Sequence, residues 1–528
     1  MRAFALCLAG AAWTALPLRA EEPPRVGRIQ VTSSDVFGPE DTARGFLYRG
    51  ANALHVVTRE STIRRFLLFE EGDPYDADRL AESERNLRAL GLFRSVSVVA
   101  GEPHDGVVDV DVVTQDAWTV EVGLSAGSGG GAARGGVALG EKNFLGTASE
   151  LRFAFAADQD RTYRSIELLT PNFLLPYTTA HVLYGNNSDG YARQFELNRT
   201  FYSTAAPWAA DVSVSDLKRD EFHYLEGGAV ESTYAARRFR LVASYGIALA
   251  ARAENASRLT LGIDFRQDRF GPSDAAPADF IPPDRLFRYV VLQWETLHAD
   301  FLKWNYVNHD ERYEDITVGP RLLLRVGVSP RAFGVPETTE LVGAEIGTGT
   351  RMGANGFLQG KAAFETRLNH GRMENATFAG NLLYVHRFEA NPKQTLLAQV
   401  SGLRGWNIDP DVQIFADAQA GLRGYKLRAF EGDGRVIFNV EHRVFSGWQW
   451  FGLISPGLAA FVDAGLVGSP ANPMRLGDIK VDAGIGLRLA MSWAPVMNVF
   501  RLDAAYAFQR DPTGRRGWLI SFSTGQAF

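Results

Sequence analysis

Hydrophobic and polar residues alternate along most of the chain, over residues 118–528. In the segment 479–489, IKVDAGIGLRL, apolar side chains fill every odd position, and charged residues or glycines fall between them. The segments 119–125, TVEVGLS, and 500–508, FRLDAAYAF, repeat this pattern. Because successive side chains of a strand point to opposite faces, this period predicts strands with one apolar and one polar face.

The first twenty residues, MRAFALCLAGAAWTALPLRA, have the order of an export signal. Arg2 supplies the positive charge, an apolar run follows, and Ala20 is a small residue at the expected cleavage site, although Leu18 is larger than such sites prefer. Cys7, the single cysteine of the chain, lies within this segment, so the mature chain is expected to hold no thiol or disulfide. No later stretch approaches the roughly 18 uncharged apolar residues of a transmembrane helix.

An exported chain with about 410 residues of alternating segments has two interpretations. In a transmembrane barrel, a closed sheet pairs every backbone group, the apolar face meets lipid and the polar face lines the lumen. A large secreted β protein is the alternative. The aromatic residues near the strand ends favour an all-β transmembrane antiparallel barrel over residues 118–528, and we count about twenty strands paired as hairpins.

Residues 24–117 follow other periods and form a separate small domain. A strand is predicted over 29–36, and Thr58 is placed to cap a helix that runs to about Leu68. Asp76 is placed to cap a second helix, with Gly91 at its C-terminal end. Two strands follow at 96–99 and 108–112, so the predicted order is β-α-α-β-β.

The phrases EGDPYDADRL and NLRALGLFRSVSV in this domain resemble a POTRA domain. The resemblance covers about 90 residues. POTRA domains are the periplasmic polypeptide-binding modules of outer-membrane assembly proteins, so the resemblance implies that an exposed strand edge pairs with an extended client segment. A generic small α/β domain is the alternative.

The composition argues against several other functions. The net charge of −6 gives no basic surface for nucleic acid. The nine histidines are scattered without metal-ligand spacing. The glycine run at 127–136 has no helix after it to hold a phosphate, and Gly123-Leu124-Ser125-Ala126-Gly127 lacks the helix that follows a nucleophile elbow. We therefore predict a protein that is not an enzyme and has neither a metal nor another cofactor.

Four short motifs follow one another in the last quarter of the chain. They are Gly421-Leu422-Arg423-Gly424-Tyr425, the strand RVIFNVEHRVF with Asn439, Glu441 and Arg443 on one face, the strand AFVDAG with Phe461, Asp463 and Gly465 on one face, and the end SFSTGQAF with Phe528. This ordered set resembles the BamA/TamA-type outer-membrane assembly superfamily, also called the bacterial surface antigen family. That family has an arginine-glycine-aromatic tip on a loop folded into its barrel.

The resemblance assigns roles to individual residues. Arg423, Gly424 and Tyr425 are expected to form the tip of an inward-folded loop at about 405–434, with Asp463 as the partner of Arg423 and Glu441 as a second acceptor. An ordinary exposed loop arginine is the alternative for Arg423. The motif Gly402-Leu403-Arg404-Gly405-Trp406 is nearly identical, but we prefer Arg423 because the Gly-Asp-Gly and Asn-x-Glu-x-Arg sequences follow it. Arg404 is then expected near the outer end of the preceding strand. Phe528 is expected to be the terminal aromatic assembly signal, and family barrels usually have sixteen strands.

The resemblance also implies a function. It predicts an insertase or translocase in the outer membrane of a Gram-negative-type bacterium, with the POTRA domain in the periplasm. Its partners would be unfolded outer-membrane or secreted polypeptides, the lipid bilayer and periplasmic accessory proteins. The seam between the first strand (about 119–125) and the last (about 518–528) would open to a client strand. A passive pore, a structural surface protein and an exporter of one partner polypeptide are the alternatives.

Overall fold

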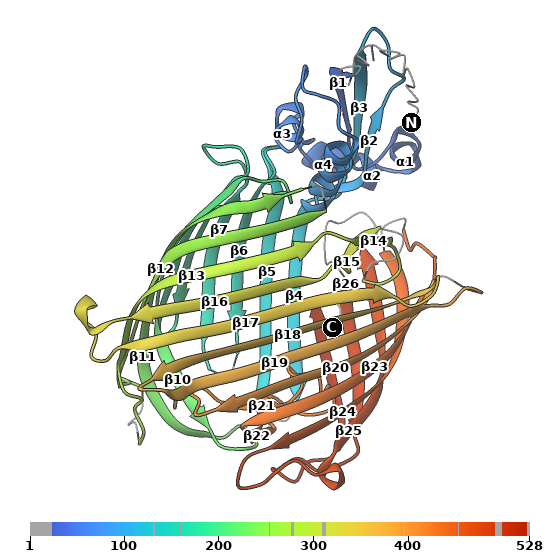
Figure 1. Cartoon of the computed structure of the whole chain (residues 1–528). Coiled ribbons are helices and arrows are strands. Elements are labelled where there is room, and N and C mark those ends of the chain that lie inside the picture. The colour runs from blue at the N-terminus through green and yellow to red at the C-terminus, as the bar shows by residue number, and fades with distance from the viewer. Residues whose placement is uncertain are drawn as a thin grey trace, which may run out of the picture.

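The protein is described by a computed structural model, which covers residues 24–129, 132–158, 160–252, 254–275, 279–308, 313–391, 393–451, 454–491 and 499–524. The predicted export signal at 1–20 and the predicted assembly signal Phe528 lie outside the described residues. A small N-terminal domain sits at one end of a large barrel (Figure 1). No helix in the described part of the chain is long and apolar enough to cross a membrane.

The N-terminal domain is a three-stranded sheet on which helices α3 and α4 pack. Its elements are β1 (Arg25–Ser34), α1 (Pro39–Arg44), α2 (Phe46–Leu54), α3 (Glu60–Arg64), α4 (Ala77–Ala89), β2 (Phe93–Ala100) and β3 (Val107–Asp116). The strand order is β1-β3-β2, with β3 parallel to β1 and antiparallel to β2. Alternate strand residues such as Ile29, Val110 and Val112 pack on Ile63 and Leu87 of the helices, and burial of these side chains holds the domain together.

The helices of this domain match the prediction only in part. The side chain of Asp76 caps α4 by accepting a hydrogen bond from the Asp78 backbone N–H, as its sequence position suggested. The prediction of a helix from Thr58 to about Leu68 is wrong: α3 is a short helix with Arg59 at its N-cap. The Thr58 backbone N–H and hydroxyl instead bond the buried carboxylate of Asp116, at 2.7 and 3.0 Å. The sequence also gave no prediction of α1 and α2.

Twenty antiparallel strands of the described chain form one closed barrel. This number agrees with the count from the alternating pattern and exceeds the sixteen that the family resemblance implies. The barrel strands are β4 (Val120–Gly129), β5 (Ala132–Phe144), β6 (Ser149–Ala157), β7 (Thr162–Thr170), β8 (Thr178–Asn187), β9 (Gly190–Arg199), β10 (Trp208–Tyr224), β11 (Val230–Ala251), β12 (Asn255–Pro272), β13 (Arg285–His298), β16 (Arg321–Ser329), β17 (Thr339–Arg351), β18 (Gly356–Asn369), β19 (Arg372–Arg387), β20 (Gln394–Trp406), β23 (Gly434–Phe445), β24 (Ile454–Gly468), β25 (Lys480–Met491), β26 (Val499–Ala507) and β27 (Gly517–Thr524).

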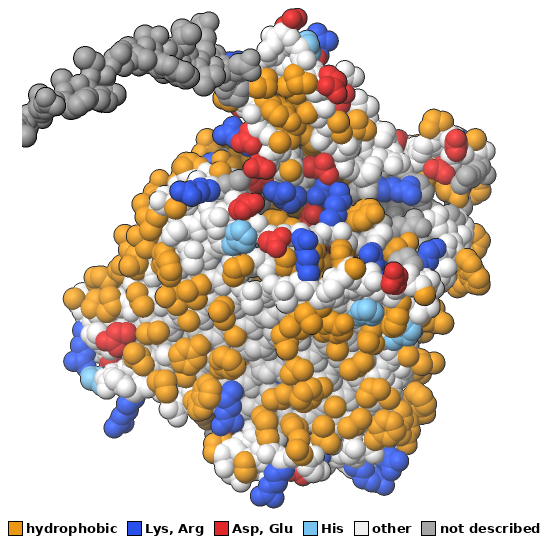
Figure 2. Space-filling model, turned by 45° about the vertical axis from the view of Figure 1, so that its right-hand side comes forward, with side chains coloured by type: hydrophobic (Ala, Val, Ile, Leu, Met, Phe, Trp, Pro, Cys, Tyr) orange, Lys and Arg blue, Asp and Glu red, His pale blue; other side chains and the backbone are white. Residues whose placement is uncertain are grey.

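The alternation of the sequence becomes the two faces of the barrel wall. Val462 and Ile485 are 50% and 67% exposed on the outside, whereas Asp463 and Asp482, their neighbours or near neighbours in the chain, are fully buried inside. Figure 2 shows hydrophobic side chains spread over the outer wall and charged side chains gathered near its two ends. An apolar outer band and a polar interior are what a membrane-spanning barrel requires.

Two segments between barrel strands form small sheets of their own. The inner hairpin consists of the described residues of 299–320, with β14 (Phe301–Trp304) paired to β15 (Glu314–Thr317). The inner loop, residues 407–433, contains the paired strands β21 (Ile414–Ala416) and β22 (Phe430–Gly432). The hairpin lies at the barrel end that carries the N-terminal domain, and β21 and β22 lie toward the opposite end, here called the far end (Figure 1). Two 3₁₀ turns, Arg331–Phe333 and Leu476–Asp478, complete the described elements.

The first and last barrel strands close the ring with few backbone pairs. Among the described residues, β27 pairs with β4 at three positions, Ile520 with Ser128, Ser521 with Gly127 and Phe522 with Ala126. The adjacent pairs are longer, with eight register positions between β26 and β27 and ten between β4 and β5. The described part of this seam therefore has fewer ladder contacts than the strands on either side of it.

Candidate functional site: a charge cluster in the barrel lumen

The inner loop places Arg423 against the inner wall of the barrel. Its guanidinium forms a bidentate pair with Asp463 on β24, with Nε to Oδ2 at 2.7 Å and Nη2 to Oδ1 at 2.8 Å. Nη1 bonds Glu441 on β23. The guanidinium carbon lies 3.5 Å from the ring centroid of Phe461, so the arginine also stacks on an aromatic face. Planar, forked donors suit this combination of carboxylates and a ring better than a lysine would.

Glu441 lies at the centre of a larger network, here called the charge cluster. Besides Arg423, its carboxylate accepts from Arg443 Nε at 2.7 Å and from Arg488 Nη2 at 3.3 Å. Arg488 Nη1 also bonds Asp503 on β26 at 2.6 Å. Glu441 is completely buried, and the arginines are at most 6% exposed. Buried charges persist only when they are paired in this way, so each member depends on the others.

Gly424 lets the loop tip approach the wall closely. A Cβ at this position would lie 2.6 Å from the Asp482 Cβ and 3.2 Å from the Ala507 backbone nitrogen. The first distance is shorter than real Cβ contacts allow and the second is tight, so a larger residue at this position must displace either the loop tip or the Asp482 side chain. Gly421 has a φ of +116°, which places the preceding turn in a region that glycine adopts without strain.

Tyr425 and Asn439 fix the loop on either side of Arg423. The Tyr425 hydroxyl lies 3.1 Å from the Val481 carbonyl oxygen and 2.9 Å from Gln509 Oε1, both of them acceptors. Asn439 Nδ2 donates to the Gly421 carbonyl oxygen at 2.8 Å and to Asp463 Oδ1 at 2.7 Å. The tip is thus bonded to strands β23 to β25 and to the turn that follows β26.

The inner loop also reaches the opposite walls of the lumen. Asp411 pairs with Arg285 on β13 at 2.6 Å and with Arg238 on β11 at 3.0 Å. Arg428 bonds Asp160, between β6 and β7, and lies 3.5 Å from the ring centroid of Tyr224 on β10. The loop therefore crosses the lumen and bonds strands or turns on several sides of the ring.

The structure brings together the five residues that the sequence assigned to the loop tip and its partners. Arg488 and Asp503 complete the cluster and were not predicted as site residues, although the alternating pattern already placed Arg488 on the polar face of its strand. Arg404 of the similar motif lies in β20, near its end, as expected. The Gly123–Gly127 pattern lies within strand β4, which is incompatible with a nucleophile elbow. In the described part of the chain, no group of three His, Cys, Asp or Glu side chains is arranged to hold a metal ion.

Residues 53–115 match the family model of the POTRA domain, described as surface antigen variable number repeat. The chain carries a POTRA domain. The resemblance of the N-terminal residues to a POTRA domain is therefore confirmed, and a closed antiparallel β-barrel follows this domain. A search of the curated proteins finds no match.

Three solved structures match the chain at low sequence identity and with TM-scores below 0.5. CdiB from Acinetobacter baumannii has a TM-score of 0.49 and 13% identity, covering 96% of this chain and 74% of that one. CdiB from Escherichia coli has a TM-score of 0.47 and 12% identity, covering 94% and 76%. BamA from Haemophilus ducreyi lacking POTRA domains 1–3 has a TM-score of 0.36 and 12% identity, covering 94% and 84%.

Proposed function

We propose that this protein is a non-enzymatic outer-membrane insertase or translocase, which accepts unfolded polypeptide in the periplasm and assembles or exports it through the barrel seam or lumen. The POTRA domain would lie in the periplasm and the far end of the barrel would face outward. The observation that carries the proposal is the β4–β27 seam, with its three register pairs among the described residues. A closed sheet with one short ladder opens there at the lowest cost in backbone hydrogen bonds.

The POTRA domain offers a place for the client to bind first. Strand β2 (Phe93–Ala100) pairs only with β3 among the described strands, although the Glu84 carboxylate of α4 accepts a hydrogen bond from its Val98 backbone N–H at 3.3 Å. An extended segment would pair along the rest of this edge. Strand pairing uses backbone hydrogen bonds, which every sequence can form, so it suits a module that must accept many clients. Insertion needs no nucleotide, because burial of apolar surface in lipid and closure of backbone hydrogen bonds both lower the free energy.

The charge cluster has a role in this mechanism. It bonds the inner loop to β23, β24 and, through Arg488 and Asp503, to β25 and β26, which are the strands that lead to the seam. We propose that Arg423 and Asp463 hold these last strands in shape while β27 separates from β4. An exporter of one partner polypeptide is the second candidate, because the inner loop bonds several sides of the lumen and its release would clear a path.

The test is the folding of an unfolded outer-membrane client in liposomes that contain this protein. A disulfide between Gly127→Cys and Ser521→Cys would close the seam, since these residues are register partners. The matched control joins Ala505→Cys and Leu519→Cys, register partners on β26 and β27, which need not separate. We expect the seam disulfide to abolish the acceleration of client folding until reductant is added, and the control to retain it.

Two outcomes would count against the proposal. If the seam disulfide leaves client folding as fast as the wild type, the seam is not the route. If the wild type gives no acceleration while forming intact barrels, the insertase is abandoned for the clients tried. Arg423→Ala in the same assay tests the role of the inner loop, and we expect it to lose most of the acceleration.

A further inference from the structure

The inner hairpin packs on an apolar patch inside the lumen. Three of its side chains, Leu302, Val307 and Val318, are buried against side chains on the lumen face of β18, β19 and β20, namely Phe357, Val385 and Leu397. Lumen faces of membrane barrels are normally polar. Here Val385 and Leu397 are at most 1% exposed, because the hairpin covers them. The wall is thus complementary to the hairpin and holds it by hydrophobic contact.

Polar contacts fix the position of the hairpin on this patch. Thr395 Oγ1 donates to the Tyr306 carbonyl oxygen at 2.5 Å. Arg387 Nη1 donates to Asn305 Oδ1 at 2.8 Å, and its guanidinium lies 4.9 Å from the Trp304 ring centroid. These contacts set the position of the hairpin on the patch in this structure.

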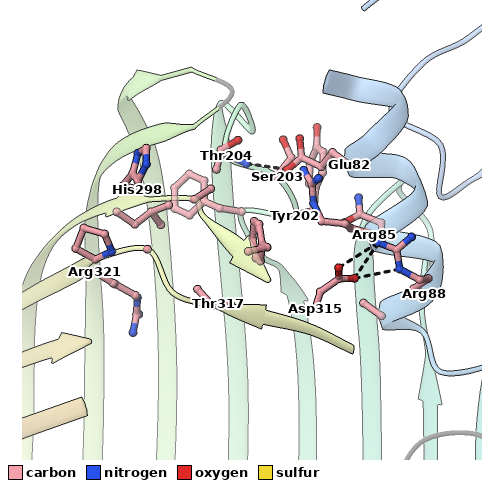
Figure 3. A pocket seen from close by; sticks show the side chains of 18 of the residues that line it. Glu82, Arg85, Arg88, Tyr202, Ser203, Thr204, His298, Asp315, Thr317 and Arg321 are labelled. Atoms are coloured by element: carbon pink, nitrogen blue, oxygen red, sulfur yellow. Dashed lines mark hydrogen bonds and ion pairs between the residues drawn. The ribbon is translucent and has the colours of Figure 1, made fainter. Parts of the chain in front are cut away.

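The POTRA helix α4 contacts the outer side of the same hairpin. Arg88 bonds Asp315 on β15, with Nη2 to Oδ2 at 2.9 Å and Nε to Oδ2 at 3.0 Å, and Figure 3 shows this pair between the helix and the hairpin. The Lys303 ammonium lies 3.5 Å from Glu84 Oε1. Beside these contacts, a cavity of about 620 Å³ separates α4 from the hairpin and from Tyr202 (Figure 3).

The inner side of the hairpin contacts the charge cluster. The Val307 carbonyl oxygen accepts a hydrogen bond from Arg443 Nη1 at 2.9 Å. The Nε of Arg443 bonds Glu441 at 2.7 Å, and Glu441 bonds Arg423 of the inner loop. Arg443 is 1% exposed, so water does not replace an acceptor that it loses.

We propose that the inner hairpin couples the POTRA domain to the inner loop. A shift of α4 would pull Asp315 and move the hairpin on its patch. The Val307 carbonyl oxygen would then leave Arg443, whose guanidinium would turn further onto Glu441. Glu441 would in turn hold Arg423 less firmly, and the inner loop would loosen. The inference goes beyond the proposed insertion activity: it rests on these contacts alone, and its test needs no client.

The first experiment measures the position of the inner loop. Spin labels at Lys426→Cys, beside the loop tip, and Leu476→Cys, an exposed residue of the far end, report the distance between the loop and the wall in lipid nanodiscs. The mature chain has no other cysteine if the export signal is removed. We expect Arg88→Ala and Asp315→Asn to broaden this distance distribution by several ångströms.

The matched control is Tyr177→Phe. The Tyr177 hydroxyl donates to the Leu67 carbonyl oxygen at 2.6 Å and so joins the POTRA domain to the turn between β7 and β8, away from the hairpin. If the hairpin is the coupling element, this variant leaves the distance unchanged. If Tyr177→Phe broadens the distribution as much as Arg88→Ala does, or if neither Arg88→Ala nor Asp315→Asn changes it, the proposal is wrong.

The second experiment holds the hairpin in place while the POTRA contact is cut. A Cβ on Gly349 would lie 2.9 Å from the Val318 Cα and 3.0 Å from the Val318 Cβ, which is shorter than the Cβ–Cβ distance of a disulfide. A disulfide between Val318→Cys and Gly349→Cys therefore requires the two segments to move slightly apart. We expect Arg88→Ala to raise single-channel conductance in planar bilayers severalfold, the added disulfide to return it to the wild-type value, and reductant to raise it again. If the disulfide does not change the conductance of the Arg88→Ala variant, the proposed coupling is wrong.

Discussion

The two segments that fold into the lumen are held by different kinds of contact. The inner hairpin buries apolar side chains on an apolar wall, and neutral groups of the hairpin, mostly backbone carbonyls, accept hydrogen bonds from the same wall. The tip of the inner loop is bonded by buried ion pairs in which one carboxylate, Glu441, serves three arginines. Hydrophobic contact tolerates small displacements, whereas a buried charge left without its partner is costly. The comparison suggests that the hairpin is built to move and the loop tip to hold or release as a unit.

Glu441→Ala should have the largest effect on how differently the inner loop tip and the inner hairpin are held. It leaves three arginines around a missing carboxylate, and a buried pair broken from one side costs roughly 3–5 kcal/mol. We expect the inner loop to leave the wall and become cleavable by protease added from the far end, while the hairpin stays protected. Glu345→Ala is the control, because Glu345 pairs with Arg321 in a more exposed position and such pairs contribute about 1 kcal/mol or less. Equal protease sensitivity of the two variants would contradict a special role for the cluster.

Gly424→Ala tests the close approach of the loop tip. The added Cβ meets Asp482 and Ala507, and overpacking of this kind costs roughly 1–3 kcal/mol. The loop should dock more weakly and unfold at lower denaturant concentration in a site-labelled protein. The control is Gly402→Ala on β20, where the nearest atom lies 3.8 Å from the new Cβ. A loop that docks equally well in both variants would show that the tip is not tightly fitted.

Val385→Ala weakens the hydrophobic contact between the inner hairpin and its apolar patch. Removal of two buried methyl groups costs roughly 1.5 kcal/mol. The inner hairpin should exchange its backbone amide hydrogens faster. The inner loop tip should follow to a smaller extent, because its own ion pairs remain and only the Val307–Arg443 contact is weakened. Hydrogen exchange measured by mass spectrometry separates the two segments. Faster exchange in the loop alone would reverse our view of which segment depends on the apolar patch.

Glu82→Gln should have the smallest effect of these variants. It changes how the docking of the POTRA domain on the barrel depends on pH. Glu82 on α4 accepts a hydrogen bond from the Thr204 backbone N–H at 3.2 Å, and burial raises the pKa of its carboxyl above the usual 4.5. A raised pKa in the folded protein means that its contribution to stability is present below pH 4.5 and is lost as the pH rises through the folded pKa. The wild-type POTRA domain should therefore dock more weakly as the pH rises from 4 toward neutrality, and Glu82→Gln should flatten this slope in limited proteolysis. An unchanged slope would mean that other groups control it.

The sequence predicts the wall of this barrel better than its contents. Strand alternation alone predicts that Val462 points outward and Asp463 inward. Successive side chains lie on opposite faces, and the apolar face must meet the lipid. The family resemblance of the tip motif and its partner motifs assigned Arg423, Asp463 and Glu441 to one site, and a guanidinium can form the bidentate pair that this site contains. The role of this group as a lock on the loop remains a prediction.

The inner hairpin was not predicted, for a physical reason. Strands of four residues such as β14 and β15 are too short for alternation to distinguish them from a connecting loop. One signal was present: the run 382–385, Leu-Leu-Tyr-Val, is apolar on both faces of β19, which is unusual for a strand with a polar lumen. Likewise, α1 and α2 are short and separated by Gly45, so their periodicity covers too few turns to identify a helix.

The twenty strands of the ring have a consequence for what fills it. Since barrel diameter grows roughly linearly with strand number, twenty strands enclose about one and a half times the cross-section of sixteen. A single infolded loop that suffices for the narrower ring would leave this one open to leakage of small solutes through an otherwise impermeable membrane. The large strand number and the presence of the inner hairpin thus depend on each other. A relative that loses four strands should lose the room for the hairpin as well, and one that keeps the wide ring without a hairpin should leak.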